Sequence, residues 1–199
     1  MAEPKTAVVI LAGGEGRRMG GGKPLQKLGN ITLVDRALDL ARAWSDTVAV
    51  AVRSADQVGD LTQVPLLLDD ETPGPVAGLA SALRFAAESG ADRVLTIPCD
   101  APHLPADLLS RLAQVIGDGS VAVASSGGQI HPVCALWRTD VRDRLPAYLA
   151  TGRSSLWGFA GACGLAVAAW DGGTDDPFAN ANTPEDLARL QPPSPRSAP

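Results

Sequence analysis

The chain has 199 residues, of which 45% are apolar and 20% charged, and its formal net charge at pH 7 is -5. This length suits one domain with its own core, and the composition is typical of a globular protein rather than a disordered or fibrous one. The negative charge, without any run of five basic residues, argues against nucleic acid as a partner. No stretch approaches the ~18 apolar residues of a membrane helix, so we expect neither an export signal nor a membrane anchor.

The cysteines are Cys99, Cys134 and Cys163. They are odd in number and widely spaced, and they form neither a C-x-x-C pair nor a zinc-ligand pattern. We therefore expect a reducing compartment and a cytoplasmic protein.

Short apolar runs alternate with segments whose apolar residues recur at helical spacing. The runs Ala7–Leu11, Val48–Val52 and Val94–Ile97 have the length and composition of buried parallel strands. Two segments between them predict helices with one buried face. Their apolar positions are Leu33, Val34, Ala37, Leu38 and Ala41 in the first, and Val76, Leu79, Ala80, Leu83 and Ala87 in the second.

This alternation predicts an α/β protein with an open, mainly parallel sheet and helices on both faces. The expected fold class is a single-domain, Rossmann-like three-layer sandwich. Further strands are expected at Ser120–Ala124, Val133–Trp137 and Leu165–Trp170. Ligands of such folds bind at the edge where the parallel strands end.

A short closing helix is predicted after Thr183, because a hydroxyl at the cap, Pro184 at the first helical position and two acids in the first turn are typical of a helix start. We expect the domain to span residues 1–190. The remaining residues, 191–199, are rich in proline and serine and predict a disordered tail.

The segment after the first expected strand reads LAGGEGRRMGGGKP and combines six glycines with Arg17, Arg18 and Lys23. Glycine allows close backbone approach, so that successive amides can point at phosphate oxygens. Guanidinium and ammonium groups add full positive charge against a triphosphate. The segment predicts a nucleoside triphosphate site rather than an ordinary exposed loop.

Two other phosphate-binding motifs do not fit this loop. A P-loop ending at Lys23 requires glycine at position 17 and Ser or Thr at position 24, where the chain has Arg17 and Pro24. The dinucleotide fingerprint that begins at Gly14 requires a third glycine where Met19 stands. Neither a P-loop NTPase nor a dehydrogenase is therefore favoured.

The pattern L-A-G-G-x-x-x-R-M-G followed by a lysine resembles the molybdenum cofactor guanylyltransferases (MobA) within the larger nucleotidyltransferase group. The resemblance covers the chain to about Leu190 through further segments in the same order. These are the run GPVAG at 74–78, PCD at 98–100, His131-Pro132 and NANTP at 180–184. It implies a Mg²⁺-dependent reaction of GTP with molybdopterin cofactor that yields the guanylylated cofactor and pyrophosphate. It also implies a partner that receives the product, either a molybdoenzyme or its chaperone.

The resemblance also assigns the loop residues. It implies that Leu11, Ala12, Gly13 and Gly14 contact the nucleotide, and Gly13-Gly14 favours guanine because relatives that use other nucleotides often have alanine first. Arg17, Arg18 and Lys23 are expected to stabilise charge as pyrophosphate leaves. Here Gly22 stands where the family usually has an acidic residue before the lysine.

Asp100 is the expected ligand of Mg²⁺ and a catalytic and nucleotide-contacting residue. It follows a buried strand and should emerge at the binding edge, where one carboxylate with phosphate oxygens and water suffices for this ion. The alternative is a cap on a helix near Leu104. Asp69 and Asp70 end another apolar run, and either could contact the ribose or base of the nucleotide; of the two we favour Asp70. The alternative is a pair of turn acids ahead of Pro73-Gly74.

Contacts with the second substrate are expected from His131, Asn180 and Asn182, although asparagines before Thr-Pro are also ordinary turn formers and His131-Pro132 could end a hairpin. Three functions remain: guanylyl transfer, the same reaction with CTP or another acceptor, and a carrier that binds nucleotide or cofactor without catalysis. Lys23 and Asp100 argue against the carrier.

Overall fold

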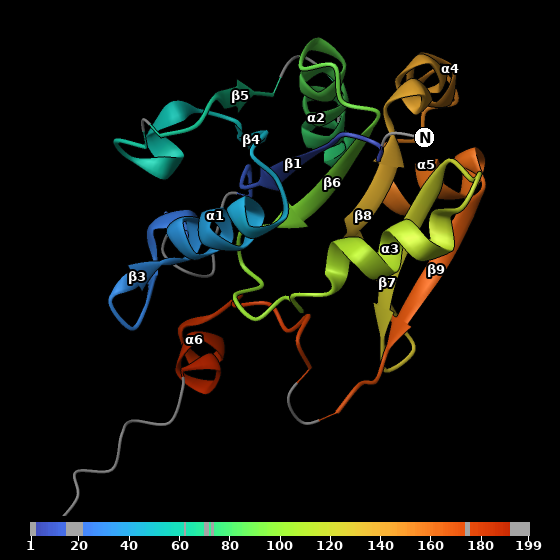
Figure 1. Ribbon diagram of the computed structural model, residues 1–199. Coiled ribbons are helices and arrows are strands. Elements are labelled where there is room, and N and C mark those ends of the chain that lie inside the picture. The colour runs from blue at the N-terminus through green and yellow to red at the C-terminus, as the bar shows by residue number, and fades with distance from the viewer. Residues whose placement is uncertain are drawn as a thin grey trace, which may run out of the picture.

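The computed structural model describes residues 3–14, 22–61, 63–69, 72, 74–173 and 176–191. Within these residues the strands form a seven-stranded sheet in the order β5-β4-β1-β6-β8-β7-β9 (Figure 1). Strand β8 is antiparallel to both neighbours, and the other adjacent pairs are parallel. The strands are β1 (Thr6–Leu11), β4 (Val48–Val52), β5 (Leu66–Leu68), β6 (Arg93–Pro98), β7 (Val121–Ser126), β8 (Gln129–Arg138) and β9 (Leu165–Trp170), with a separate hairpin of β2 (Lys27–Leu28) and β3 (Ile31–Thr32).

The predicted strands are confirmed, and β8 is the one whose start differs most. It begins at Gln129, so His131 and Pro132 lie inside the strand and neither precede it nor end a hairpin. Val123 pairs with Ala135, but the next residue, Ala124, pairs with His131, so the register shifts at this point. Such a bulge accommodates Pro132, which has no N–H for the ladder.

Helices cover both faces of the sheet and make the expected three layers. They are α1 (Leu33–Trp44), α2 (Ala77–Glu88), α3 (Leu108–Ile116), α4 (Leu145–Leu149), α5 (Leu156–Cys163) and α6 (Pro184–Leu190), with short 3-10 turns η2 (Lys23–Leu25), η3 (Ala55–Val58), η4 (Gly74–Val76) and η5 (Thr139–Arg144). Helices α1 and α3 pack on one face, and α2, α4 and α5 on the other. No helix in the described part of the chain is long and apolar enough to cross a bilayer.

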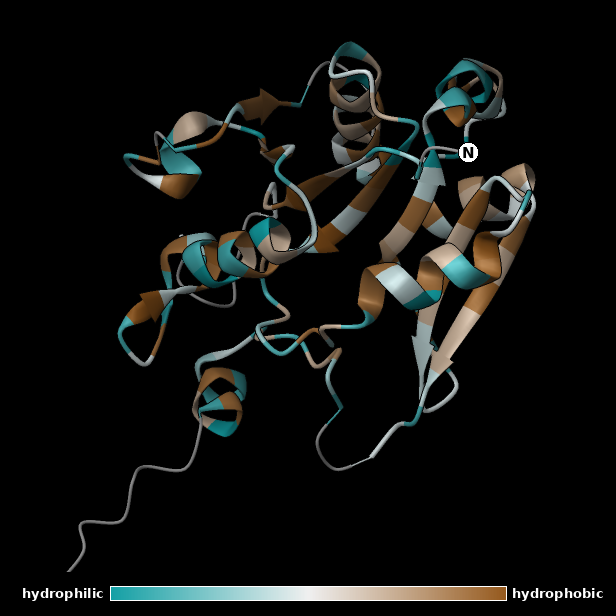
Figure 2. Ribbon diagram, viewed as in Figure 1, coloured by the Kyte–Doolittle hydropathy of each residue, from teal (hydrophilic) through white to brown (hydrophobic). Residues whose placement is uncertain are grey.

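The alternation of side chains along β1 shows how one strand serves both layers. Val8 and Ile10 belong to the core under α1 and α3, whereas Ala7 and Val9 belong to the core under α2. Period-two alternation of this kind follows from the pleat, and burial on both faces explains the continuous apolar run. Figure 2 shows the apolar colouring along the strands and polar colouring on the outward sides of the helices.

Helix α1 illustrates how the sequence sets a local element. The Thr32 hydroxyl accepts a hydrogen bond from the Asp35 amide at 3.1 Å and so caps the first turn. The helix buries the five apolar residues that its spacing predicts, namely Leu33, Val34, Ala37, Leu38 and Ala41. The hydrophobic pattern alone therefore determines which face packs on the sheet.

The order of the strands brings distant motifs together. From β1 the chain adds β4 and then β5 on one side, and it then returns to place β6 on the other side of β1. In the β1–β6 pair Leu11 lies beside Pro98, so the loops that follow these strands start next to each other. This is a topological switch point, where open α/β sheets bind ligands.

Helix α6 closes the domain over the hairpin and the start of α1. Ala181 and Leu187 form a small buried cluster with Leu28 and Leu33, and Leu190 packs against it. The predicted closing helix is thus confirmed, with Thr183 at its N-cap. The expected tail at residues 192–199 lies outside the described residues.

Gly74 is a position where the fold requires glycine. Its φ is +77°, and a Cβ there would lie 2.7 Å from the Ser154 Cβ and in collision with the Ser154 hydroxyl. We expect Gly74→Ala to lower the free energy of unfolding by at least about 1–2 kcal/mol, the cost of left-handed backbone alone. Urea unfolding measures it.

Gly161 offers the matched control, because it lies inside α5 and a Cβ there meets nothing within 4 Å. Gly161→Ala should be neutral or stabilising by about 0.5–1 kcal/mol. If Gly74→Ala and Gly161→Ala changed the free energy of unfolding equally, that result would contradict the close contact between the loop before α5 and the start of α2.

Candidate active site

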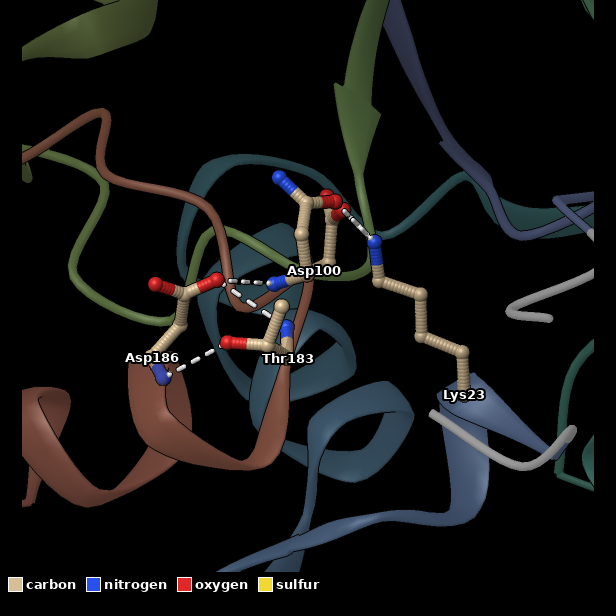
Figure 3. A network of polar contacts seen from close by, with 5 residues as sticks. Lys23, Asp100, Thr183 and Asp186 are labelled. Atoms are coloured by element: carbon tan, nitrogen blue, oxygen red, sulfur yellow. Dashed lines mark hydrogen bonds and ion pairs between the residues drawn. The ribbon is translucent and has the colours of Figure 1, made fainter. Parts of the chain in front are cut away.

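Lys23, Asp100 and Asn182 meet at the carboxyl ends of β1 and β6. The Lys23 Nζ forms an ion pair with Asp100 Oδ2 and donates a hydrogen bond to Asn182 Oδ1 at 2.7 Å. Figure 3 shows the lysine reaching from the first turn after the glycine-rich loop to Asp100 beneath the end of β6. Three segments far apart in the sequence therefore share one cation.

Backbone contacts fix each of the three partners. Gly22, with φ 58°, turns the chain in the left-handed region immediately before Lys23. The Cys99 amide donates to the Leu11 carbonyl at 3.3 Å, which holds the turn after β6 against the end of β1. The Ala181 amide donates to the Asp100 carbonyl at 2.8 Å and thereby docks the last segment on the same turn.

Asp100 does not cap a helix. The next helix, α3, begins at Leu108 and has Asp107 at its N-cap. The side chain of Asp100 is 15% exposed and that of Lys23 is 13% exposed, so the pair is largely shielded from water. At such a site an ion pair is screened by salt less than at the open surface.

The two oxygen atoms that contact the Lys23 ammonium also suit a divalent cation as ligands. A carboxylate oxygen and an amide oxygen converge on one point, and both are hard ligands of the kind that Mg²⁺ and Mn²⁺ accept. Among the described residues no group of three or more His, Cys, Asp or Glu side chains could hold a metal. The ligand set therefore fits an ion that takes the rest of its shell from phosphate and water rather than a cage made by the protein.

The first residues of the glycine-rich loop pack tightly. The Ala12 amide donates to the Ala51 carbonyl at 2.8 Å, which extends the β1–β4 ladder. A Cβ at Gly13 would lie 3.2 Å from Asp69 Oδ2, and a Cβ at Gly78 would lie 3.2 Å from the Leu11 side chain. Both glycines thus permit close approach, while a Cβ at Gly14 would meet nothing within 4 Å. Arg17, Arg18 and Asp70 lie outside the described residues.

A cavity of about 290 Å³ adjoins Asp100 on the side of β8. It is lined by Pro98, Asp100, Gln129, Ile130, His131, Pro132, Val133, Cys134, Phe178 and Asn180. The structure therefore separates the two predicted asparagines, because Asn182 contacts Lys23 whereas Asn180 lines this cavity with His131. A larger cavity of about 620 Å³ lies at the opposite, amino-terminal end of the sheet beside Lys5 and Thr6, far from the predicted motifs.

His131 is held on two sides within this wall. Its ring stacks on Phe178 with centroids 4.6 Å apart and 12° between the planes, and its Nε2 lies 2.7 Å from the Ser126 hydroxyl. Burial lowers the pKa of His131, and the negative charge of Asp176 opposes that shift. The ring is consequently neutral near pH 7 and presents a polar aromatic surface.

Cys99, directly before Asp100 in the chain, is a buried thiol. Burial raises the pKa of its thiol to about 12, and the charge of Asp100 adds to this effect. Burial likewise raises the pKa of Cys134. All three cysteines are free thiols in this structure, and these two act as small apolar core residues.

Two residues beyond the predicted set belong to the site's surroundings. Asp186, which the sequence predicts only as an acid in the first turn of a helix, accepts a hydrogen bond from the backbone amide of Asn182. The spacing Thr183-x-x-Asp186, which is that of a capping box, is the sequence signal for such backbone contacts. Phe178 lies in a segment without regular periodicity, and no sequence pattern marks it as the partner of His131.

Comparison with known proteins identifies the family of this chain. Residues 8–183 match the MobA-like NTP transferase domain. The molybdenum cofactor guanylyltransferase of Cereibacter sphaeroides is 40% identical over 184 residues, which cover 92% of this chain and 94% of that protein.

Two solved structures share the fold. The molybdopterin-guanine dinucleotide biosynthesis protein A of Archaeoglobus fulgidus is 21% identical with a TM-score of 0.71, covering 92% of this chain and 95% of its own. A Mycobacterium tuberculosis protein solved as a complex with manganese is 17% identical with a TM-score of 0.62, covering 94% of this chain and 97% of its own. By its matched domain and its identity to curated relatives over nearly the whole chain, this protein belongs to the MobA-like NTP transferase family.

Proposed function

We propose that this protein transfers GMP from GTP to the molybdopterin form of the molybdenum cofactor, giving the guanine dinucleotide cofactor and pyrophosphate. The observation that carries the proposal is the meeting of Lys23, Asp100 and Asn182 where β1 and β6 end. The curated relative with 40% identity bears the name of this activity.

In the reaction, an oxygen of the acceptor's terminal phosphate attacks the α-phosphorus of GTP. The bond between that phosphorus and the oxygen bridging to the β-phosphorus breaks, and the electron pair leaves with pyrophosphate. Lys23 orients the triphosphate and offsets the charge that develops on the leaving group, with Arg17 and Arg18 as further candidates. No covalent intermediate with the protein is required.

A divalent cation, which we propose to be Mg²⁺, fits the oxygens of Asp100 and Asn182 and would supply charge neutralisation on the triphosphate. With those oxygens bound to the metal, the Lys23 ammonium would be free to contact phosphate oxygens, because they are its two protein acceptors in this structure. The lysine and the metal ligands form one unit in this proposal.

The two substrates take opposite sides of Asp100. We assign the nucleotide to the loop Leu11–Gly14 and to Asp70. The acceptor is assigned to the cavity with His131 and Asn180, with Asn182 between the two sites. A stacked, neutral aromatic wall with amide groups suits a planar, polar heterocycle such as a pterin. We further propose that the reaction is cytoplasmic and that a molybdoenzyme or its chaperone receives the product.

The reaction is tested by incubating the full chain with Mg²⁺, molybdopterin cofactor and each nucleoside triphosphate in turn while pyrophosphate release is measured. We expect turnover with GTP only. Turnover with CTP alone would reject guanine specificity, and tight binding of GTP without pyrophosphate would identify a carrier.

Asp100→Asn and Lys23→Gln are each expected to lower kcat/KM at least about 100-fold, the scale for losing one group that stabilises charge in the transition state. The controls are Asp92→Asn and Lys5→Gln. Both positions lie at the opposite end of the sheet, where the Lys5 amide donates to the Asp92 carboxylate at 2.9 Å. The controls should keep full activity, and an unchanged Asp100→Asn enzyme would refute the assignment of the metal.

The neutral state of His131 has a consequence for stability. The folded protein lowers the pKa of His131 below the ordinary histidine value of about 6.5. The contribution of His131 to the free energy of unfolding is therefore fully present above that pH and is lost as the pH falls through the folded pKa. We expect urea unfolding between pH 8 and pH 5 to show this loss in the wild type and a smaller loss in His131→Gln.

His103→Gln provides the matched control for this experiment. His103 Nε2 lies 2.9 Å from the Leu190 carbonyl, away from the cavity, and His131 stays in place in this variant. The control should therefore retain the loss of stability that His131 causes. A wild-type pH dependence that persists unchanged in His131→Gln would contradict a lowered His131 pKa.

A further inference from the structure

The segment Ala181–Leu190 lies across the site as a strap, defined here as these ten residues. Its first residue is bonded to Asp100 through the backbone, and its helix packs on Leu28 and Leu33 of the segment that follows Lys23. At its far end the Leu190 carbonyl contacts His103 Nε2 at 2.9 Å. The strap is therefore anchored at both ends.

Asn182, which reaches Lys23 from this strap, is itself exposed to solvent. Apolar packing cannot fix the orientation of an exposed amide side chain, so hydrogen bonds must do so. Asp186 provides these bonds on the backbone side, because its Oδ2 accepts from the Asn182 amide at 3.0 Å and from the Thr183 amide at 2.9 Å.

The Asp186 carboxylate is well placed for this task. Its side chain is 17% exposed, and its second oxygen is paired with Arg189. The two backbone amides thus converge on one shielded, charged oxygen, and hydrogen bonds to charged acceptors are stronger than neutral ones. In Figure 3 Asp186 and Thr183 lie to the left of and below the contact between Lys23 and Asp100.

We propose that Asp186 is a positioning residue for the transfer reaction, holding the backbone of Asn182 so that its side-chain oxygen stays beside Asp100, where it meets Lys23 in this structure. This inference rests on the proposed function. Asp186 touches neither Lys23 nor Asp100 and acts through Asn182.

The competing explanation is that Asp186 only caps helix α6. Thr183 separates the two explanations, since its hydroxyl accepts from the Asp186 amide at 3.1 Å and is the other half of the capping box. Thr183→Ala removes that cap, at a cost of about 1 kcal/mol in stability, but leaves both bonds from backbone amides to the Asp186 carboxylate. Asp186→Ala removes those two bonds.

The experiment compares Asp186→Ala, Thr183→Ala, Asn182→Ala and the double variant Asp186→Ala/Asn182→Ala in the full chain. Pyrophosphate release is measured with GTP, Mg²⁺ and molybdopterin cofactor, and stability by urea unfolding. Asp186→Ala should lower kcat about tenfold, the effect of losing roughly 1.4 kcal/mol of orientation, whereas Thr183→Ala should stay within about twofold.

The double variant tests the route of the effect. If Asp186 acts through Asn182, its replacement adds little once Asn182 is alanine, because mutations in one network are not additive. Asp186→Asn should recover part of the lost kcat, since one amide oxygen can still accept. Fully additive losses, or equal losses for Asp186→Ala and Thr183→Ala, would overturn the proposal.

A readout without turnover separates this inference from the proposed function. The backbone and side-chain amide resonances of Asn182, assigned in ¹⁵N spectra by comparison with Asn182→Ala, should shift in Asp186→Ala but not in Thr183→Ala. The backbone amide, which donates to Asp186, should also lose its protection from exchange in Asp186→Ala. If the wild type fails to release pyrophosphate yet shows this pattern, the transfer reaction is wrong and the positioning by Asp186 holds. If the resonances are unchanged in Asp186→Ala, the positioning is wrong whatever the reaction.

Discussion

A single ammonium group, that of Lys23, joins three segments of the chain at the candidate active site. It contacts a carboxylate from the turn after β6 and an amide from the segment before α6. The Asp100 carboxylate, which is 15% exposed, would be costly to shield alone, since a charge withdrawn from water needs a compensating contact. The ends of β1 and β6, the turn at Gly22 and the docking of α6 all serve to make this contact possible.

Much of the scaffold could be predicted because it depends on local patterns. The five buried residues of α1 follow from helical spacing, and Val48–Val52 follows from a continuous apolar run between turn signals. The meeting of the first loop with Asp100 follows from the rule that right-handed crossovers place the ends of parallel strands at one edge. The start of β8 differs from the prediction, because a proline such as Pro132 indicates a strand boundary in the sequence. The bulge that accommodates Pro132 depends on the pairing of β8 with β7.

The rest could not be predicted, since it is set by tertiary contacts without sequence periodicity. The stack of His131 on Phe178 joins β8 to an irregular segment, and neither residue signals the other. Asn180 and Asn182 look equivalent in sequence, yet Asn180 lines the cavity, whereas Asn182 contacts Lys23 and donates its backbone amide to Asp186. The resemblance of motifs predicts the chemistry, whereas the separation of these two asparagines is visible only in the geometry.

The strap across the site bears on how the protein is made in the cell. Lys23 and Asn182 are 159 positions apart in the chain, so the contact between them is among the most non-local in the fold. Contacts of such long range form late, after the cost of closing the intervening loop has been met. On the ribosome, which releases a chain from its N-terminus, the sheet can form around β1 and β6 while Lys23 still lacks its second acceptor. A nascent chain would therefore acquire its fold before it acquires a complete site.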